Sequence, residues 1–216
     1  EGLKLPFYSI SCSAGMSEGH LLGRLLPTGE GGRFEYHRSD FVKAYEEGGV
    51  FLLDEIDAAD ANTLLVLNSA IANGHLSVPN RLGNTVAKRH KDFVLVAAAN
   101  TWGKGANRVY CGRNALDEAF LNRFTAGTCE LDYDEKLEAA LSGSPALARA
   151  LQLLRKKARK ANLHRVISMR NCIDFAKTIS GGPNPDGWRT LDECVERLTQ
   201  SWTPEEKQQV GLSSDQ

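Results

Sequence analysis

The sequence lacks any long hydrophobic run. Although 42% of its 216 residues are hydrophobic, no apolar stretch approaches the ~20 residues that a membrane-spanning helix needs. The first ten residues, EGLKLPFYSI, also lack the layout of a secretory signal. These absences argue against a membrane protein, and we expect a protein of the cytoplasm.

Cysteine is scarce, and its positions suggest no pairing. The sequence has five cysteines, an odd number, with no CxxC pair among them. This distribution argues against a disulfide framework or a zinc site and favours free thiols in a reducing compartment. The five are Cys12, Cys111, Cys129, Cys172 and Cys194. The histidines likewise show no spacing typical of metal ligands.

Neither sign of charge dominates. The chain has 26 Lys and Arg against 27 Asp and Glu, a formal net charge of −1. This balance predicts neither a dedicated nucleic-acid binder nor a protein of the membrane surface. The charged fraction of 25% is that of an ordinary globular protein. The length suits one large domain, or a large and a small one.

The pattern of apolar residues divides the chain into two regions. Residues 1–133 alternate strand-like runs with helical patterns, which is typical of a mostly parallel α/β sheet. Residues 134–216 show only helical signals. We therefore predict an α/β domain over residues 1–133, followed by a small all-α domain over residues 134–216.

Several elements of these domains can be placed from turn and cap residues. We expect strands at 7–12, 50–53 and 93–99, the last buried on both faces, and a hairpin in LLPTGEGGRFEYHR. Residues 74–89 suggest a second hairpin or an irregular insert. Capping residues predict helices from Ser39 or Asp40 to Glu47 and from Asp57 or Asp60 to Gly74. Later helices begin at Ser144-Pro145 and at Ser168, the latter ending before Gly181-Gly182.

The segment GGVFLLDEID places two carboxylates directly after an apolar strand. Ligands in open α/β sheets gather at the carboxyl ends of strands, where Asp54 and Glu55 would lie. One carboxylate can hold Mg²⁺ and the next can orient a water that attacks phosphorus. The alternative is a strand that simply ends in acidic residues that start a helix.

Three further residues carry similar chemistry. Asn100 follows the apolar strand at 93–99, and its amide can bond a phosphate oxygen or a water, or it can simply form a turn. Arg123 ends a short helix, where it can pair with its own surface or reach a neighbouring subunit's nucleotide. Arg170 lies in the first turn of a helix, opposing the dipole at a cost of ~0.3–1 kcal/mol that an anionic ligand could offset.

Together these segments resemble the AAA+ ATPases, and within them the MoxR group and the AAA+ subunit of cobaltochelatase. GGVFLLDEIDAAD is similar to the Walker B strand, VLVAAANTWGKG to the sensor 1 strand, NALDEAFLNRF to the arginine-finger helix and ISMR to the start of sensor 2. The two hairpin candidates resemble the inserts of this branch.

The resemblance implies a role for each residue. Asp54 would coordinate Mg²⁺, Glu55 would activate water and Asn100 would position it. Arg123 would act across a subunit boundary, and Arg170 would sense the γ-phosphate of ATP. The resemblance also implies hexameric rings, partners with von Willebrand A domains, and work in remodelling proteins or inserting metals.

The phosphate-binding motif of such ATPases, GxxxxGK[ST], occurs nowhere in the sequence. By the resemblance, LKLPFYSISC matches the end of the first helix and the second strand, so the loop would lie upstream. We therefore expect a C-terminal fragment of a longer ATPase that is itself inactive. We also expect a sheet of the family's strands 2, 3 and 4, with the segment at 127–131 displaced or unpaired.

Two other classes of function stay open at this point. One is a non-catalytic interaction module that keeps the AAA+ shell and works by binding alone. The other is a nucleic-acid motor. Residues 139–173 contain eight Lys or Arg and no Asp or Glu, and such a basic patch could follow a phosphate backbone. Such a run is also typical of a solvated helix face or of an interface with an acidic surface.

Overall fold

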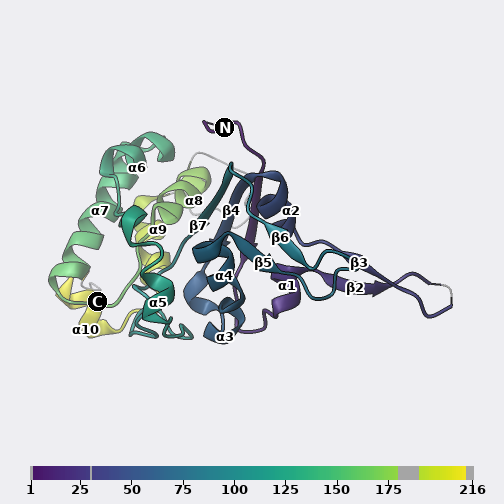
Figure 1. Ribbon diagram of the computed structural model, residues 1–216. Coiled ribbons are helices and arrows are strands. Elements are labelled where there is room, and N and C mark those ends of the chain that lie inside the picture. Colours follow the sequence, from purple (N-terminus) through teal and green to yellow (C-terminus); the bar gives the residue numbers. More distant parts are fainter. Residues whose placement is uncertain (1, 30, 180–189, 213–216) are drawn as a thin grey trace. The chain divides into compact units, whose positions relative to one another are not determined.

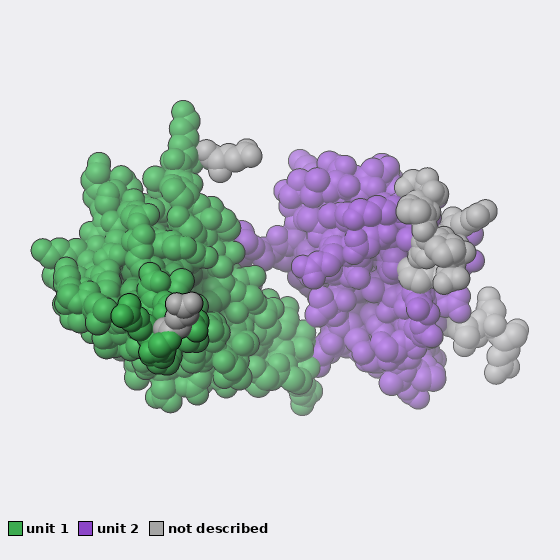
Figure 2. All heavy atoms as spheres, turned by 90° about the vertical axis from the view of Figure 1, so that its right-hand side faces the viewer, with its two compact units in different colours: residues 1–128 green, residues 129–216 purple. Residues whose placement is uncertain are grey.

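The computed structural model describes residues 2–29, 31–179 and 190–212. The chain divides into two compact units, Glu1–Thr128 and Cys129–Gln216, coloured separately in Figure 2. We call them the α/β unit and the helical unit and describe each by itself. The predicted helix stop at Gly181-Gly182 lies outside the described residues.

A three-stranded parallel sheet forms the centre of the α/β unit (Figure 1). Its strands are β1 (Phe7–Ser11), β4 (Gly49–Asp54) and β7 (Phe93–Ala97), in the order β1-β4-β7. They are the three strands expected from the sequence. Residues 128–134 form no strand, which agrees with the expected unpaired segment. The parallel sheet with its helices, and the helices that follow, confirm the predicted fold class.

Short helices connect and cover these strands. They are α1 (Glu18–Leu22), α2 (Asp40–Glu47), α3 (Ala61–Leu64), α4 (Val66–Asn73) and α5 (Glu118–Leu121). Single 3₁₀ turns lie at Ile56–Ala58 and Thr125–Gly127.

Local cap chemistry explains where the helices begin and end. The Ser39 side chain accepts a hydrogen bond from the backbone N–H of Val42 and so caps α2. Gly48 ends that helix at φ 89°, a left-handed value that glycine adopts without strain. The helix predicted from Asp57 or Asp60 to Gly74 is instead two helices, and Asp60 caps the first of them, α3.

Two antiparallel hairpins extend from the α/β unit. The first pairs β2 (Arg24–Pro27) with β3 (Phe34–His37), and the second pairs β5 (His75–Ser77) with β6 (Val86–Lys88). The first lies where its glycine-rich turn predicted it, and the second shows that residues 74–89, expected as a hairpin or an irregular insert, form a hairpin. The Tyr36 hydroxyl donates to the Leu22 carbonyl at 2.6 Å, which ties the first hairpin to α1. Figure 1 shows this hairpin projecting from the sheet.

Only one face of the sheet is packed into the core. Phe51 of β4 and Phe93 of β7 lie on that face, and both rings meet Phe41 of α2 edge to face, with centroids 5.1 and 5.8 Å apart. On the opposite face Val94 is 38% and Val96 41% exposed. The prediction that the strand at 93–99 is buried on both faces is therefore wrong. Side chains of a strand alternate between faces, and the described residues leave Val94 and Val96 on the second face partly exposed.

The helical unit contains α6 (Glu135–Ser142), α7 (Pro145–Lys160), α8 (Met169–Ile179), α9 (Leu191–Leu198) and α10 (Pro204–Gln209). The apolar stripe predicted for α7 is buried and forms the centre of a separate hydrophobic core. The stripe consists of Leu147, Leu151, Leu154 and Ala158.

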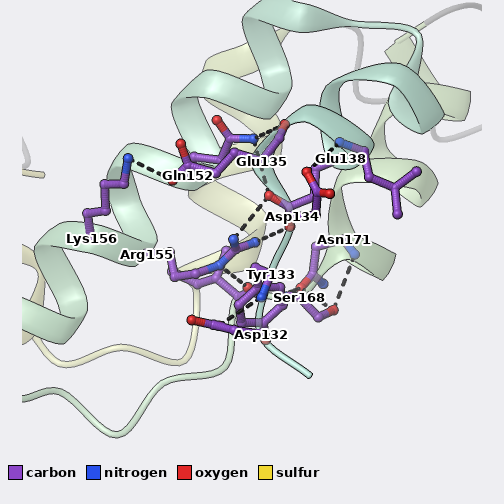
Figure 3. Close-up of polar contacts among 12 residues, drawn as sticks. Asp132, Tyr133, Asp134, Glu135, Glu138, Gln152, Arg155, Lys156, Ser168 and Asn171 are labelled. Atoms are coloured by element: carbon purple, nitrogen blue, oxygen red, sulfur yellow. Dashed lines mark hydrogen bonds and ion pairs between the residues drawn. The ribbon is translucent and has the colours of Figure 1, made fainter. Parts of the chain in front are cut away.

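A buried ion pair fixes the packing of α6 on α7 (Figure 3). Glu138 is fully buried, and both its oxygens face the Arg155 guanidinium, with the Nη1 contact at 3.0 Å. The Nε of Arg155 donates to the Ile167 carbonyl at 2.7 Å, just before α8. The guanidinium also stacks on the Tyr133 ring, 3.6 Å from its centroid. One arginine thus joins α6, the segment before it and the start of α8.

Candidate functional site at the sheet edge

The carboxyl ends of the three strands meet at one edge of the sheet. Ser11 of β1 is in register with Asp54 of β4, and Leu53 is in register with Ala97 of β7. The chain beyond β4 is tied to the chain beyond β7, because the Ile56 N–H donates to the Ala98 carbonyl at 2.9 Å. The residues that follow β4 and β7 therefore lie side by side, as the sequence predicted.

Asp54 and Glu55 stand at the centre of this edge. Asp54 is exposed, and its Oδ1 accepts the Glu55 N–H at 3.0 Å. Glu55 adopts φ 53° and ψ 41°, a left-handed conformation that costs a residue with a Cβ ~1–2 kcal/mol. Its side chain is 45% exposed. This backbone turn ends the strand abruptly and leaves both carboxylates at the edge.

Asp57 anchors the same edge from below the surface. It is fully buried, and its Oδ2 accepts two hydrogen bonds from Thr101, from the N–H at 2.9 Å and from the hydroxyl at 2.7 Å. Asn100 precedes Thr101 and is exposed. The segment that carries Asn100 is therefore held against the turn that follows Glu55. Sequence reasoning placed Asp57 only as a possible start of a helix and missed this role.

Arg113 also reaches this edge, although no pattern in the sequence points to it. Its Nη2 lies 3.4 Å from Glu55 Oε1 and its Nη1 lies 3.5 Å from Asp57 Oδ1. The residue lies in a loop without periodicity, far along the chain from both carboxylates. Only the folded backbone brings the three together.

Cys12, at the end of β1, is a buried thiol beside the acidic residues. Its N–H donates to the Asp54 carbonyl at 2.8 Å. Burial, followed by the negative charges of Asp54, Asp57 and Glu55, raises the pKa of the Cys12 thiol to about 11. The thiol is therefore protonated at neutral pH and is unsuited to act as a nucleophile.

Of the two predicted arginines, only Arg123 lies in the α/β unit, and among the described residues it forms no ion pair with these carboxylates. Arg123 is exposed at the end of α5, and its Nε donates to the Asn68 side chain of α4 at 3.0 Å. Arg170 is exposed in the first turn of α8 and belongs to the helical unit. The α/β unit thus brings together Asp54, Glu55 and Asn100 at one edge, with Arg123 bonded instead to Asn68.

Half of the basic residues in the stretch at 139–173 are paired with carboxylates inside the helical unit. Besides the buried Arg155, three of its side chains form ion pairs with acidic residues outside the stretch. These pairs are Lys156 with Glu135 at 2.7 Å, Arg159 with Asp132 at 3.0 Å, and Arg165 with Glu206 at 2.6 Å. Four of the eight cations are therefore not free to follow a phosphate backbone, which disfavours the reading as a nucleic-acid motor.

The sheet edge offers one carboxylate ligand for a magnesium ion whose other ligands would be water and phosphate oxygens. Among the described residues, no three His, Cys, Asp or Glu side chains come together to hold a metal. Asp54 nevertheless offers an exposed carboxylate whose second oxygen accepts no hydrogen bond from any described residue. Mg²⁺ commonly takes one or two carboxylates and completes its shell with water and substrate phosphates. Asp54 therefore fits such an ion.

A groove of about 430 Å³ is lined by residues of β1, α1, the first hairpin, α2 and β4. Its lining includes Ile10, Arg24, His37, Arg38 and Phe51 and excludes the carboxylates of the edge. Arg38 is already paired with Glu46 and Glu47.

In the described part of the chain, no helix is long and apolar enough to cross a membrane.

Two relatives of known sequence match part of this chain. Midasin of Dictyostelium discoideum is 37% identical over 107 residues, which make up 49% of this chain and 2% of midasin. An uncharacterised protein of Staphylococcus epidermidis is 31% identical over 134 residues, 61% of this chain and 47% of that protein. The chain therefore spans less than half the length of either relative.

One solved structure and one protein-family model also match this chain. The crystal structure of a candidate ATPase from Cytophaga hutchinsonii matches with a TM-score of 0.47 and 18% identity, covering 82% of this chain and 46% of that one. The family described as AAA domain (dynein-related subfamily) matches residues 3–124. That match covers more than half of the sequence and includes the three strands and the edge with Asp54, Glu55 and Asn100. The chain thus belongs to the AAA domain family, in its dynein-related subfamily.

Proposed function

We propose that this chain supplies the water-activating part of the ATP-hydrolysing site in a AAA+ ATPase of the MoxR or cobaltochelatase type. The observation that carries the proposal is the pair Asp54 and Glu55 at the end of β4, beside the segment that carries Asn100. Buried Asp57 ties these two segments together through Thr101. A carboxylate that can bind Mg²⁺, a second carboxylate that can act as a base and an amide at one sheet edge suit the hydrolysis of a phosphoanhydride.

The roles of the residues follow from their chemistry. Asp54 would hold Mg²⁺, and the bound ion would supply charge neutralisation at the phosphates of ATP. Glu55 accepts the proton of the attacking water, and Asn100 orients that water by hydrogen bonds. Arg123 acts on the nucleotide of a neighbouring subunit, and Arg170 contacts the γ-phosphate.

The whole protein then works as an assembly. AAA ATPases commonly form rings, and we propose a hexamer of the whole protein in the cytoplasm. Its hydrolysis of ATP drives the remodelling of a partner protein or of a metal-insertion complex, with a von Willebrand A domain as the expected kind of partner. We place residues 134–216 as the lid domain of this ATPase. The change of pattern at 133/134 and the split of the units at 128/129 fall in the same segment without helix or strand.

The proposal is tested by replacing Glu55 in the whole protein. Glu55→Gln removes the base but keeps the size of the side chain, so we expect kcat for ATP to fall by a factor on the order of 10²–10⁴ with little change in KM. Glu35→Gln, at an exposed position of β3, is the matched control and should leave kcat unchanged. A Glu55→Gln protein that retains its kcat within twofold would contradict the proposal. A whole protein that hydrolyses no ATP at all would favour a non-catalytic interaction module.

A further inference from the structure

Arg113 contacts two carboxylates with two different nitrogens of one guanidinium. Nη1 faces Asp57 at 3.5 Å, and Nη2 faces Glu55 at 3.4 Å. The Arg113 side chain is 13% exposed and that of Asp57 is fully buried, whereas that of Glu55 is 45% exposed. The arginine therefore joins a buried anion to an exposed one at the surface of the sheet edge.

The backbone on either side of Arg113 is fixed to the same turn. The N–H of Asn114 donates to the Asp57 carbonyl at 2.7 Å, and its side-chain amide donates to the Ala59 carbonyl at 2.9 Å. Further along, the Leu116 N–H donates to the Gly103 carbonyl at 2.8 Å. The loop that carries Arg113 is thus fastened to both segments that form the edge.

The buried end of this contact is incompletely satisfied. Asp57 Oδ1 and Arg113 Nε are both buried and have no hydrogen-bond partner in the described structure. Asp57 already receives two hydrogen bonds from Thr101 on its other oxygen. A guanidinium that served Asp57 alone would do best by hydrogen-bonding Oδ1 directly. Instead it lies between the two carboxylates, at nearly equal distances from both.

We propose that Arg113 is a positioning residue for Glu55, with Asp57 as its anchor. This inference rests on the function proposed above, in which Glu55 is the base. The planar guanidinium holds its nitrogens in a fixed geometry, so fixing one side on Asp57 fixes the direction of the other. Glu55 has no hydrogen bond from its own side chain in the described structure, and this ion pair restricts where its carboxylate lies. Arg113 does not itself contact the reacting atoms.

Replacing Arg113 with lysine distinguishes two roles of the arginine: positioning Glu55 and compensating the charge of Asp57. Lysine has a single ammonium and cannot face two carboxylates from separate, rigidly linked nitrogens. In Arg113→Lys we expect the ammonium to remain with buried Asp57, where an unpaired charge is most costly. The melting temperature should then stay close to that of the parent protein while Glu55 loses its partner.

Kinetics of the whole protein give the first readout. Arg113→Lys and Arg113→Gln should each lower kcat for ATP on the order of tenfold to a hundredfold, the usual effect of a misplaced catalytic group, and leave KM within about twofold. Arg108→Gln, an exposed arginine of the same loop without an ion pair in the described structure, is the control and should leave both constants unchanged. If Arg113→Lys keeps both the kcat and the melting temperature of the parent protein, Arg113 only balances the charge of Asp57 and the proposal is wrong.

A second variant guards against loss of the fold. In Asp57→Asn with Arg113→Gln both buried charges are removed together, and the asparagine oxygen can still accept from Thr101. This protein should fold and should show the same loss of kcat as Arg113→Gln. A double variant that folds and keeps the parent kcat would overturn the proposal.

The second readout does not depend on hydrolysis. In the 216-residue chain labelled with ¹³C at the glutamate carboxyls, Arg113→Lys and Arg113→Gln should move the side-chain resonance of Glu55, and Arg108→Gln should not. An unmoved Glu55 resonance refutes the positioning role whatever the protein hydrolyses. Conversely, if Glu55→Gln leaves kcat unchanged while the resonance responds to Arg113, the proposed function fails and the contact between the two residues stands.

Discussion

At the scale of single residues, each fully buried carboxylate in the described part of the chain faces an arginine. Glu138 with Arg155 in the helical unit and Asp57 with Arg113 in the α/β unit each set a carboxylate of zero exposure against an arginine. The first pair is fully hydrogen-bonded, and the second is left open towards Glu55. A complete pair serves packing, whereas an incomplete one has capacity for a further partner.

The Glu138 and Arg155 pair gives a prediction about stability. Glu138→Gln leaves the Arg155 guanidinium buried without its counter-charge, so we expect a loss of ~3–5 kcal/mol in the free energy of unfolding. Glu138→Leu combined with Arg155→Met removes both charges and should cost less than the single change. Lys156→Ala breaks only an exposed pair with Glu135 and should cost about 1 kcal/mol or less. Urea unfolding followed by circular dichroism measures all three, and a double variant less stable than Glu138→Gln would contradict this account.

Residue chemistry could be predicted only where it follows a recognisable element. Asp54, Glu55 and Asn100 were found because each follows directly after an apolar strand, whose end fixes their place. Arg113 lies in a loop whose residues follow no period, and its partners are distant in sequence. Its role depends on the tertiary path of the chain, which no local pattern encodes.

At the scale of elements, boundaries set by caps and glycines were predicted well. Ser39 and Gly48 define α2, and Gly74 ends α4, because each residue satisfies a specific backbone requirement. The burial of β7 was predicted wrongly. When every residue of a strand is apolar, the sequence contains no alternation that tells a covered face from an open one.

The open face of β7 predicts a difference between neighbouring positions. Val96 is 41% exposed, whereas Leu95 packs against the core. Val96→Lys should therefore change the free energy of unfolding by less than about 1 kcal/mol and should reduce self-association of the chain, because exposed apolar sheet surface promotes it. Leu95→Lys places a charge towards the core and should cost at least about 2 kcal/mol. Sedimentation velocity and urea unfolding test the pair, and equal effects at both positions would show that the two faces are covered alike.

At the scale of the whole molecule, the sequence contains acidic and amide groups for phosphate chemistry without a glycine-rich loop to hold the phosphates. Backbone N–H groups and a lysine provide most of the contacts to ATP in a GxxxxGK[ST] loop. The 216 residues contain no such motif. Under the proposed function, the candidate site therefore has groups to activate water and few groups to bind the nucleotide tightly.

This imbalance predicts weak binding by the 216-residue chain. Titration calorimetry with Mg²⁺ and ATP should show no binding at micromolar concentrations and no hydrolysis, because Asp54 alone cannot replace a phosphate loop. The control is the whole protein under the same conditions, for which we expect Mg²⁺-dependent binding. Micromolar affinity in the 216-residue chain would show that other residues of this chain hold the phosphates.

The left-handed backbone of Glu55 sets stability and activity in opposition. Glycine would adopt φ 53° without the penalty that a Cβ brings, so a chain selected only for a firm fold would gain by exchanging the glutamate. Such an exchange would delete the carboxylate on which the proposed chemistry depends. Searches for thermostable variants of this protein would therefore favour inactive sequences at this position, and position 55 should be held fixed in any such screen.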